Sequence, residues 1–197
     1  MKVPPRIQPL VEDGLVDEVI SRLMSGKEAD VYVVRSAGEI RCAKVYKDVT
    51  TRSFKQAVQY QEGRKVRNTR RGRAMERGSK FGKQQKEQTW HTAEVDALAL
   101  LADTEVRVPE AHGLFDGVLL MELITGADGR VAPRLADISM ASEEAIKDHV
   151  TVIDFIKKML CIGMVHGDLS EFNVLVDANG PVIIDLPQAV DASANNH

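Results

Sequence analysis

The sequence predicts an α+β protein whose N-terminal part is rich in β-strands and whose later part is mainly helical. Strand-like runs fill residues 16–46, a helical apolar stripe runs through 142–163, and two short apolar runs flank an Asn-Gly pair between 174 and 186. The 197 residues, 44% hydrophobic and 28% charged, are typical of a globular protein of one or two domains.

Composition excludes several classes of protein. The net charge of -3 does not mark the whole molecule as a binder of polyanions. Cys42 and Cys161 fit no disulfide framework or zinc-ligand spacing, so both are expected to be buried thiols. The N-terminus lacks the apolar run of a signal peptide, and no apolar run reaches the roughly 18 residues of a membrane span. We therefore expect a cytoplasmic protein with no membrane partner.

The first predicted hairpin carries a lysine on an apolar face. The runs "VYVVR" and "IRCAKVY" flank "SAGE" and predict two strands within residues 31–46. Alternation places Lys44 on one face with Ile40, Cys42 and Tyr46. Such a lysine either covers apolar surface with its stem while its head reaches water, or has a functional partner inside the fold.

A strongly basic segment follows, from about residue 52 to 88. It contains "RKVRNTRRGRAMERGSKFGK" (64–83) and shows little apolar periodicity, which predicts a long flexible loop with a short helix near "SFKQAVQYQ". The charge either keeps the loop solvated or forms a surface for phosphate groups, those of a nucleotide or of a nucleic acid.

The stretch "TWHTAEVDALALLAD" predicts a helix with a carboxylate inside its apolar stripe. The apolar members of that stripe are Trp90, Ala93, Ala97, Leu98 and Leu101. Glu94 lies among them, and an unpaired buried carboxylate is costly, so it needs a cation partner or a solvated cleft. Lys44, the lysine at an inward-facing strand position, is the matching partner.

Two more elements precede the C-terminal hairpin. After turn signals in residues 106–117, "VLLMELITG" predicts a strand that stops at Gly126. "SEEAIKDHVTVIDFIKKMLCIG" predicts a long helix with Ser142 as its N-cap and Gly163 as its stop. The helix has an apolar stripe, expected to pack on a core, made of Ile146, Val150, Ile153, Ile156 and Leu160.

Residues 165–186, "VHGDLSEFNVLVDANGPVIIDL", gather two acids and an amide. The Asn-Gly pair predicts a hairpin, and a register in which paired numbers sum to about 357 sets Asn173 opposite Ile184 and beside Asp185. Asn173 and Asp185 offer oxygen ligands that suit Mg²⁺ shared with substrate phosphates, which leaves Asp168 to accept a proton from a hydroxyl. The alternative is an ordinary hairpin with solvated polar ends.

In order along the chain, a strand lysine, a helix glutamate and the motif HxD…N…D follow the pattern of protein-kinase-like phosphotransferases. The finer spelling resembles the RIO atypical kinases, above all their bacterial members, which are described as serine kinases. "SGKEADVY" resembles their phosphate-binding loop, "HGDLSEFNVLV" their catalytic loop and "IIDLPQAV" their metal-binding loop. The resemblance runs from about residue 14 to 190 and implies a two-lobed protein-kinase-like (RIO) fold, with a β-sheet N-terminal lobe and a truncated, mainly helical C-terminal lobe.

This resemblance implies a nucleotide site. The residues that would cover the ATP phosphates are Ser25, Gly26, Lys27 and Glu28. Lys44 would contact phosphate oxygens, and Glu94 would hold Lys44. Met121 would be the gatekeeper, with the backbone of Glu122 and Ile124 meeting adenine.

The resemblance also implies the chemistry. Asp168 would be the catalytic base, and Asn173 and Asp185 would bind Mg²⁺ or Mn²⁺. The acceptor would be a serine of a protein substrate or of the chain itself, with Ser53 and Ser79 available in the basic loop. Autophosphorylation and ATPase activity would follow, and Asp185 would also be able to accept a phosphoryl group.

Three departures from ordinary protein kinases matter. The phosphate loop has a single glycine, Gly26, so few backbone amides can approach a phosphate. Ser170 stands where protein kinases usually carry a lysine, so transition-state charge must be neutralised elsewhere. Gly167 replaces the arginine that pairs with a phosphorylated activation loop, and nothing like that loop follows Asp185.

The expected organisation is a tail at 1–13, an N-terminal lobe at 14–124 that includes the basic loop, and a partial C-terminal lobe at 125–197. Since family members generally continue into further helices, we expect a fragment with an exposed apolar patch on the C-terminal lobe. Two other functions remain open. One is a nucleotide-gated ATPase switch that binds ribosomal RNA or the small ribosomal subunit through residues 64–83, and the other is a small-molecule hydroxyl kinase of the aminoglycoside or choline type.

Overall fold

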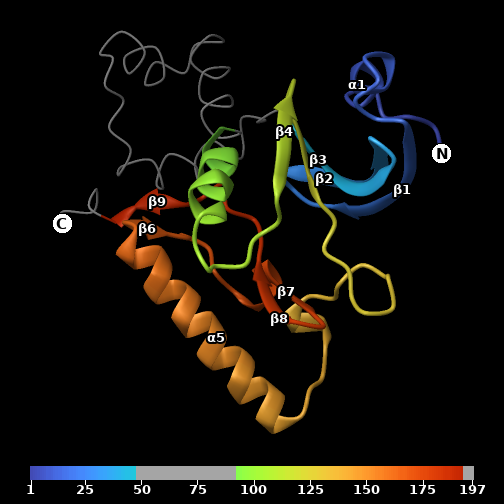
Figure 1. Ribbon diagram of the computed structural model, residues 1–197. Coiled ribbons are helices and arrows are strands. Elements are labelled where there is room, and N and C mark those ends of the chain that lie inside the picture. The colour runs from blue at the N-terminus through green and yellow to red at the C-terminus, as the bar shows by residue number, and fades with distance from the viewer. Residues whose placement is uncertain (48–91, 193–197) are drawn as a thin grey trace, which may run out of the picture. The chain divides into compact units, whose positions relative to one another are not determined.

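The computed structural model describes residues 1–47 and 92–192, which fall into two compact units (Figure 1). Of these described residues, the first unit contains 1–47, 92–95 and 111–123, and the second contains 96–110 and 124–192. The predicted basic loop, the helix expected within it, Trp90, Ser53 and Ser79 lie outside the described residues. No helix in the described ranges has the length and apolar character needed to cross a membrane.

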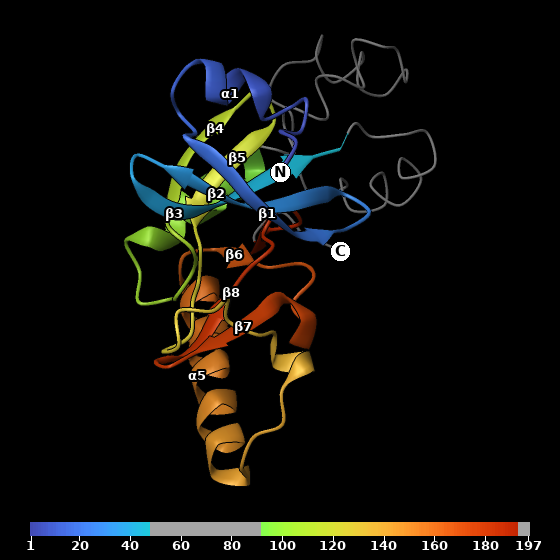
Figure 2. The same ribbon diagram turned by 90° about the vertical axis from the view of Figure 1, so that its right-hand side faces the viewer.

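The first unit is built on an antiparallel sheet with strand order β1-β2-β3-β5-β4 (Figure 2). Its strands are β1 (Glu18–Ser25), β2 (Ala29–Ser36), β3 (Glu39–Tyr46), β4 (Ala111–Phe115) and β5 (Val118–Glu122). The predicted hairpin is β2–β3. Its turn residues Ala37 and Gly38 have φ angles of 51° and 79°, which match the right-handed twist of the two strands.

Strand β4 lies in the stretch 106–117, for which the sequence predicts only turns. Asp116 and Gly117, with φ angles of 46° and 77°, form a second tight turn that joins β4 to β5. All five residues of β4 are half-buried, and its register shifts between Ala111 and Gly113. Neither an alternating pattern nor an apolar run therefore marks this strand in the sequence.

The N-terminal residues form a packed helix, which corrects the expected tail at 1–13. Helix α1 (Gln8–Glu12) has a proline in its first turn, where the missing N–H is not needed. Ile7 and Leu10 are buried at 0% and 2% exposure, in a cluster with strand residues that include Val19 and Val34. The apolar residues between the prolines are thus part of the core of the first unit.

Replacing Ile7 by alanine is expected to lower the free energy of unfolding by about 2 to 5 kcal/mol, because the buried side chain leaves a cavity. Urea titration of the whole chain measures the loss. The control is Gln8→Ala at the exposed neighbouring position, where the change should stay within about 0.5 kcal/mol. Equal effects of the two substitutions would mean that the segment is a tail after all.

Residues 92–102 form a helix, as the apolar stripe in the sequence predicts. Its buried residues are Ala93, Glu94, Ala97, Leu98 and Leu101. The carboxylate predicted to face inward therefore does so.

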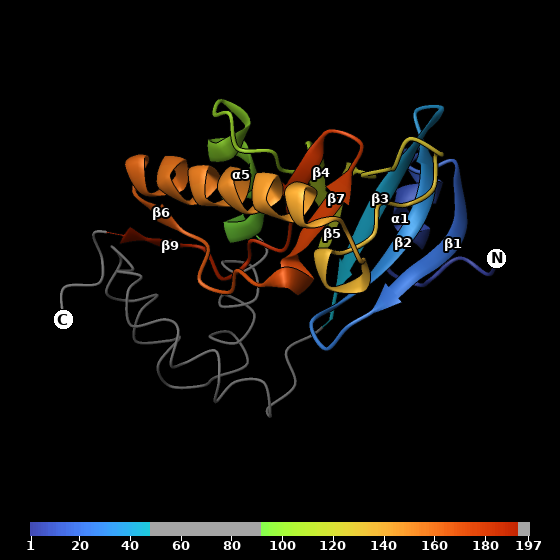
Figure 3. The same ribbon diagram turned by 90° about the horizontal axis from the view of Figure 1, so that it is seen from below.

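The second unit combines one long helix with two short antiparallel ribbons (Figure 3). Its elements are η2 (Leu135–Asp137), α5 (Ser142–Cys161), β6 (Met164–Val165), η3 (Glu171–Asn173), β7 (Val174–Asp177), β8 (Gly180–Ile183) and β9 (Val190–Asp191). Strand β6 pairs with β9 and β7 with β8, and α5 packs on β6 and β8. The pairs Val174–Ile183 and Asp177–Gly180 have the register predicted from the Asn-Gly turn.

Helix α5 packs through a different face from the one predicted. Ile146, Val150 and Leu160 are 65%, 62% and 51% exposed, whereas Phe155 and Met159 are buried. The helix carries apolar residues on two sides, so spacing alone does not select the packed side. The exposed side is the apolar patch expected on the C-terminal lobe.

Two details at the ends of α5 also differ from expectation. The N-cap is Ala141 rather than Ser142, and its N–H donates to the Glu144 carboxylate at 3.4 Å. Cys161, expected to be a buried thiol, is exposed, whereas Cys42 is buried as predicted. Gly163, with a φ of 77°, follows the helix as predicted.

Candidate active site

A buried ion pair lies on the first unit. The Lys44 ammonium donates to the two Glu94 carboxylate oxygens at 2.7 and 2.8 Å, and the residues are 8% and 2% exposed. In the sheet, Lys44 stands between Val31 of β2 and Leu119 of β5, and Glu94 supplies a counter-charge in these apolar surroundings. The pairing predicted from the sequence is confirmed.

Tyr46 completes this arrangement and was not assigned from the sequence. Its hydroxyl donates to the same Glu94 carboxylate, and the Lys44 ammonium lies 5.5 Å from the centre of its ring. Alternation along β3 already places Tyr46 on the face of Lys44, which is the signal that could have identified it. Glu94 is therefore fixed by two donors from one strand.

The predicted phosphate-covering residues form the tight connection between β1 and β2. The Gly26 N–H donates to the Ala29 carbonyl at 2.8 Å, and Lys27 and Glu28 are exposed at its tip. Three residues that sequence reasoning did not assign hold this connection. They are Arg22, Asp30 and Lys47, and the Lys47 ammonium donates to the Gly26 carbonyl at 2.7 Å.

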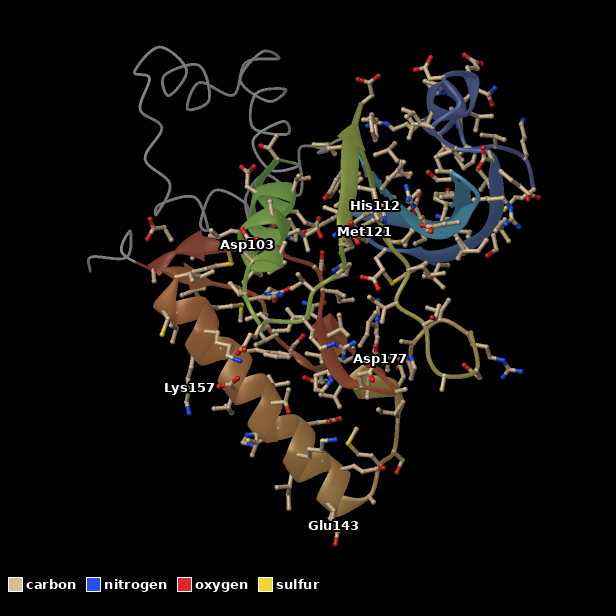
Figure 4. The ribbon with its side chains drawn as sticks, viewed as in Figure 1. Asp103, His112, Met121, Glu143, Lys157 and Asp177 are labelled. Atoms are coloured by element: carbon tan, nitrogen blue, oxygen red, sulfur yellow. The ribbon has the colours of Figure 1, made fainter. Side chains whose placement is uncertain are left out.

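The predicted adenine-contacting residues lie at and after the end of β5. Met121, marked in Figure 4, is half-buried and pairs with Cys42, and Glu122 is the exposed last residue of the strand. Ile124 is buried in the second unit, where its carbonyl accepts from the Ala132 N–H at 2.9 Å.

The second unit brings together the three polar residues predicted from the C-terminal hairpin. The Asn173 side-chain amide donates to the Asp168 carbonyl at 2.8 Å and to its carboxylate at 3.3 Å. The Ile184 N–H donates to the Asn173 carbonyl at 3.0 Å, which puts Asp185 next to this pair. Asp168 is exposed and Asp185 is half-buried, so water can reach the group.

His166 links the two loops that carry the acids. Its Nδ1 accepts from the Asp168 N–H at 3.3 Å, so Nε2 carries the ring proton and donates to the Ile184 carbonyl at 3.0 Å. The ring is 2% exposed. The sequence motif included this histidine, but its role is visible only in the structure, where it holds the backbone of Asp168 and of Ile184, the residue before Asp185.

Gly167 is required by its surroundings. Its φ is 81°, and a Cβ atom there would lie 2.4 Å from the Gln188 carbonyl oxygen. An arginine at this position is therefore excluded by backbone conformation and by space, which accounts for its absence between His166 and Asp168.

Gly167→Ala should destabilise the fold more than Gly163→Ala does. Gly163 has a similar φ of 77° but open space around the added methyl group, so it isolates the conformational cost of roughly 1 to 2 kcal/mol. The overlap with Gln188 should add about 1 to 3 kcal/mol at Gly167. Urea unfolding of the two variants compares these costs, and equal losses would show that the backbone near Gln188 yields freely.

The closed end of the β7–β8 hairpin is anchored by Arg107. Its guanidinium donates to both Asp177 oxygens at 2.9 and 2.5 Å and to the Gly180 carbonyl at 3.1 Å. Its carbonyl also accepts from the Ile183 N–H at 2.9 Å. Figure 4 marks Asp177 at this end of the hairpin. The hydrogen bond from Arg107 holds the pKa of Asp177 below its usual value.

Arg107→Met should lower the free energy of unfolding by about 1 to 3 kcal/mol at pH 7, because it leaves the Asp177 carboxylate without its charged partner. A lowered pKa means that the ion pair stabilises the folded state above the unfolded pKa, near 3.9, and that this contribution is lost as pH falls through the folded value.

The difference between wild type and Arg107→Met should therefore shrink below about pH 4 in urea titrations. Arg35→Met, which removes an exposed arginine 3.9 Å from Glu18, is the control and should change stability by no more than about 0.5 kcal/mol. A gap between wild type and Arg107→Met that stays constant down to pH 3 would contradict the assigned ion pair.

The donor set at the open end of the hairpin fits a hard divalent cation. The Asn173 amide nitrogen is engaged with Asp168, so its side-chain oxygen is the atom that a metal would bind, beside the Asp185 carboxylate. The described residues contain no group of three or more His, Cys, Asp or Glu side chains that could hold a metal alone. Two oxygen ligands suit Mg²⁺, which retains waters and shares phosphate oxygens.

Sequence comparison finds the same family along most of the chain. A family model described as the RIO domain matches residues 30–197. Human serine/threonine-protein kinase RIO1 is 33% identical over 180 residues, which are 90% of this chain and 30% of that protein. RIO-type kinase Rio1 of Haloferax volcanii is 30% identical over 187 residues, covering 93% of this chain and 59% of its own length. The chain thus spans less than two thirds of either relative.

Solved structures show the same fold. The Rio2 kinase from Chaetomium thermophilum in an ADP/Mg²⁺-phosphoaspartate complex matches with a TM-score of 0.65 and 22% identity, over 98% of this chain and 53% of that one. A second structure of that kinase gives a TM-score of 0.66 at 21% identity, over 98% and 54%. The predicted two-lobed α+β kinase-like fold is confirmed.

Proposed function

This chain belongs to the RIO domain family, and on that premise we propose that it is an ATP- and Mg²⁺-dependent phosphotransferase of the serine/threonine protein kinase type. The observation that carries the proposal is that Asn173 donates to Asp168 at 2.8 and 3.3 Å and accepts from the Ile184 N–H at 3.0 Å, which brings the neighbouring residue Asp185 to the same place. A carboxylate, an amide oxygen and a second carboxylate are the groups that phosphoryl transfer requires.

We assign the two compact units to the two lobes of a kinase, the second being a partial C-terminal lobe. In the first lobe, Lys44 contacts phosphate oxygens, and Glu94 and Tyr46 fix its position. The connection at Ser25 to Glu28 covers the phosphates. Met121 is the gatekeeper, and adenine meets the backbone of Glu122 and Ile124. Because the Ile124 carbonyl accepts from Ala132, its N–H is the group left to meet adenine.

In the second lobe, Asp168 orients the acceptor hydroxyl and takes its proton. A bond forms between the acceptor oxygen and the γ-phosphorus, the bond from that phosphorus to the bridging oxygen breaks, and ADP leaves. Asn173 and Asp185 would hold Mg²⁺ or Mn²⁺, which when bound neutralises phosphate charge. His166 keeps the two acidic loops in register.

The names of the relatives favour a serine of a protein, or of the chain itself, over a small-molecule hydroxyl as the acceptor. The phosphoaspartate named in the Rio2 complex supports a second route, in which Asp185 accepts the phosphoryl group and water then releases it. We propose this ATPase switch as the second candidate, with a cytoplasmic location. Its partner would be ribosomal RNA or the small ribosomal subunit, bound through residues 64–83.

Incubation with radiolabelled ATP and Mg²⁺ tests the proposal. Asp168→Ala should reduce phosphoryl transfer about 10² to 10⁴-fold, since the proton acceptor is lost. Asp185→Ala should abolish Mg·ATP turnover, because a metal ligand is removed. Asp103→Asn changes an exposed carboxylate and serves as the control, with turnover near that of wild type.

Retained turnover in Asp185→Ala would contradict the metal assignment. Label on serine that resists acid supports the protein kinase. Free phosphate, or protein label released by hydroxylamine, supports the aspartyl-phosphate switch, for which salt-dependent binding of ribosomal RNA is the next measurement.

A further inference from the structure

Three donors converge on one carboxylate oxygen beside the predicted phosphate loop. Asp30 Oδ1 accepts from Arg22 Nη2 at 2.7 Å, from Ser25 Oγ at 2.7 Å and from Lys47 Nζ at 2.9 Å. Arg22 and Ser25 belong to β1, whereas Lys47 directly follows β3. The three groups thus come from two separate segments of the first unit and meet at a single negatively charged atom.

Two of the three donors, Lys47 and Ser25, have all their protons engaged within the protein. Besides Asp30, the Lys47 ammonium donates to the Gly26 carbonyl at 2.7 Å and to the Ser25 hydroxyl oxygen at 3.3 Å, which accounts for its three protons. The single hydroxyl proton of Ser25 goes to Asp30. Neither side chain can donate to a phosphate oxygen while it keeps these bonds.

The charge of the cluster suits an anion. Arg22 and Lys47 carry two positive charges against the single carboxylate of Asp30. Partial burial alone would raise the pKa of Asp30, but the hydrogen bonds from Ser25, Lys47 and Arg22 outweigh it and lower the pKa to about 2. Asp30 is therefore a permanent anion at neutral pH, held by the donors that would otherwise bind one.

We propose that Arg22, Ser25 and Lys47 form a phosphate subsite of this loop, and that the Asp30 carboxylate competes with a nucleotide phosphate for it. The inference rests on the proposed function, since the ligand is the phosphate chain of ATP or ADP. A loop with one glycine supplies few amide donors, so its side chains must supply the rest. Entry of a phosphate oxygen requires Asp30 to turn away and give up its three donors.

Competition between Asp30 and a phosphate and a purely structural role of Asp30 predict opposite effects of its removal on nucleotide affinity. Removing the Asp30 charge should tighten nucleotide binding, whereas a carboxylate that merely holds the loop in shape would weaken binding when removed. Since the pairs are partly exposed, the expected gain is modest, about 3- to 10-fold in Kd.

Calorimetric titration of the whole chain with ATP, with tripolyphosphate and with adenosine, all in the presence of Mg²⁺, provides the test. Asp30→Asn should bind ATP and tripolyphosphate about 3- to 10-fold more tightly and leave adenosine affinity unchanged. Glu18→Gln removes an exposed carboxylate from the same strand as Arg22 and serves as the charge-matched control. Its affinities should stay within about twofold of wild type.

The cations give the reciprocal test. Lys47→Met and Arg22→Met should each weaken ATP binding about 3- to 10-fold without affecting adenosine, and Lys47→Arg should restore most of the loss. In the Lys47→Met background, Asp30→Asn should produce a smaller gain than in wild type, because one of the released donors is absent.

The outcomes separate this inference from the proposed function. If wild type binds ATP and Asp30→Asn binds it equally or more weakly, the competition is overturned and the proposed function stands. If Glu18→Gln gains as much ATP affinity as Asp30→Asn, the gain comes from the change in net charge, and the proposed competition is overturned as well. Wild type that binds neither ATP nor adenosine would overturn the proposed function, and the subsite with it.

Discussion

A charged group inside a fold must meet a partner there, and in the first unit this constraint fixes the elements that surround Lys44. The lysine stands in the middle of the sheet, so the helix over residues 92–102 must present Glu94 to it. Tyr46 adds a donor from the same strand, which leaves the carboxylate little freedom to turn. The gain from such a pair is geometric precision more than stability, since desolvation offsets much of the attraction.

In the second unit, hydrogen bonds from His166, Asn173 and Arg107 hold the loops that carry the acids. His166 is buried and uses both ring nitrogens, one for each of the two loops that carry the acids. Asn173 joins these loops again through its side chain and its backbone. Arg107 holds the far end of the hairpin, where no functional group is assigned. These hydrogen bonds at both ends of the hairpin hold Asp168 and Asp185 in one place although water can reach them.

The positions of residues that break a local pattern, such as a charge on an apolar face, were predictable from the sequence. The positions of residues in segments without a distinctive pattern were not. Lys44 and Glu94 stand out because charge rarely faces a core, and the register that places Asn173 follows from a turn centred between Ala178 and Asn179. The packed N-terminal helix is hidden because its prolines are typical of a tail as well as of a helix start. Strand β4 lacks an alternating pattern, so the sequence does not distinguish it from a turn. Helix α5 is apolar on two sides, and only tertiary packing decides which side is buried. The donors around Asp30 are common surface residues whose meeting depends on the turn between β1 and β2.

Asp185 lies in the left-handed region of the backbone, with a φ of 67°. Among residues other than glycine, aspartate and asparagine tolerate that conformation best, because their short polar side chains can bond locally. Of these, aspartate alone brings a negative charge, and glutamate, which has the same charge, is less suited to this backbone. The position is thus constrained twice, by conformation and by charge, so the range of residues that evolution can place there is narrower than ligand chemistry alone would allow.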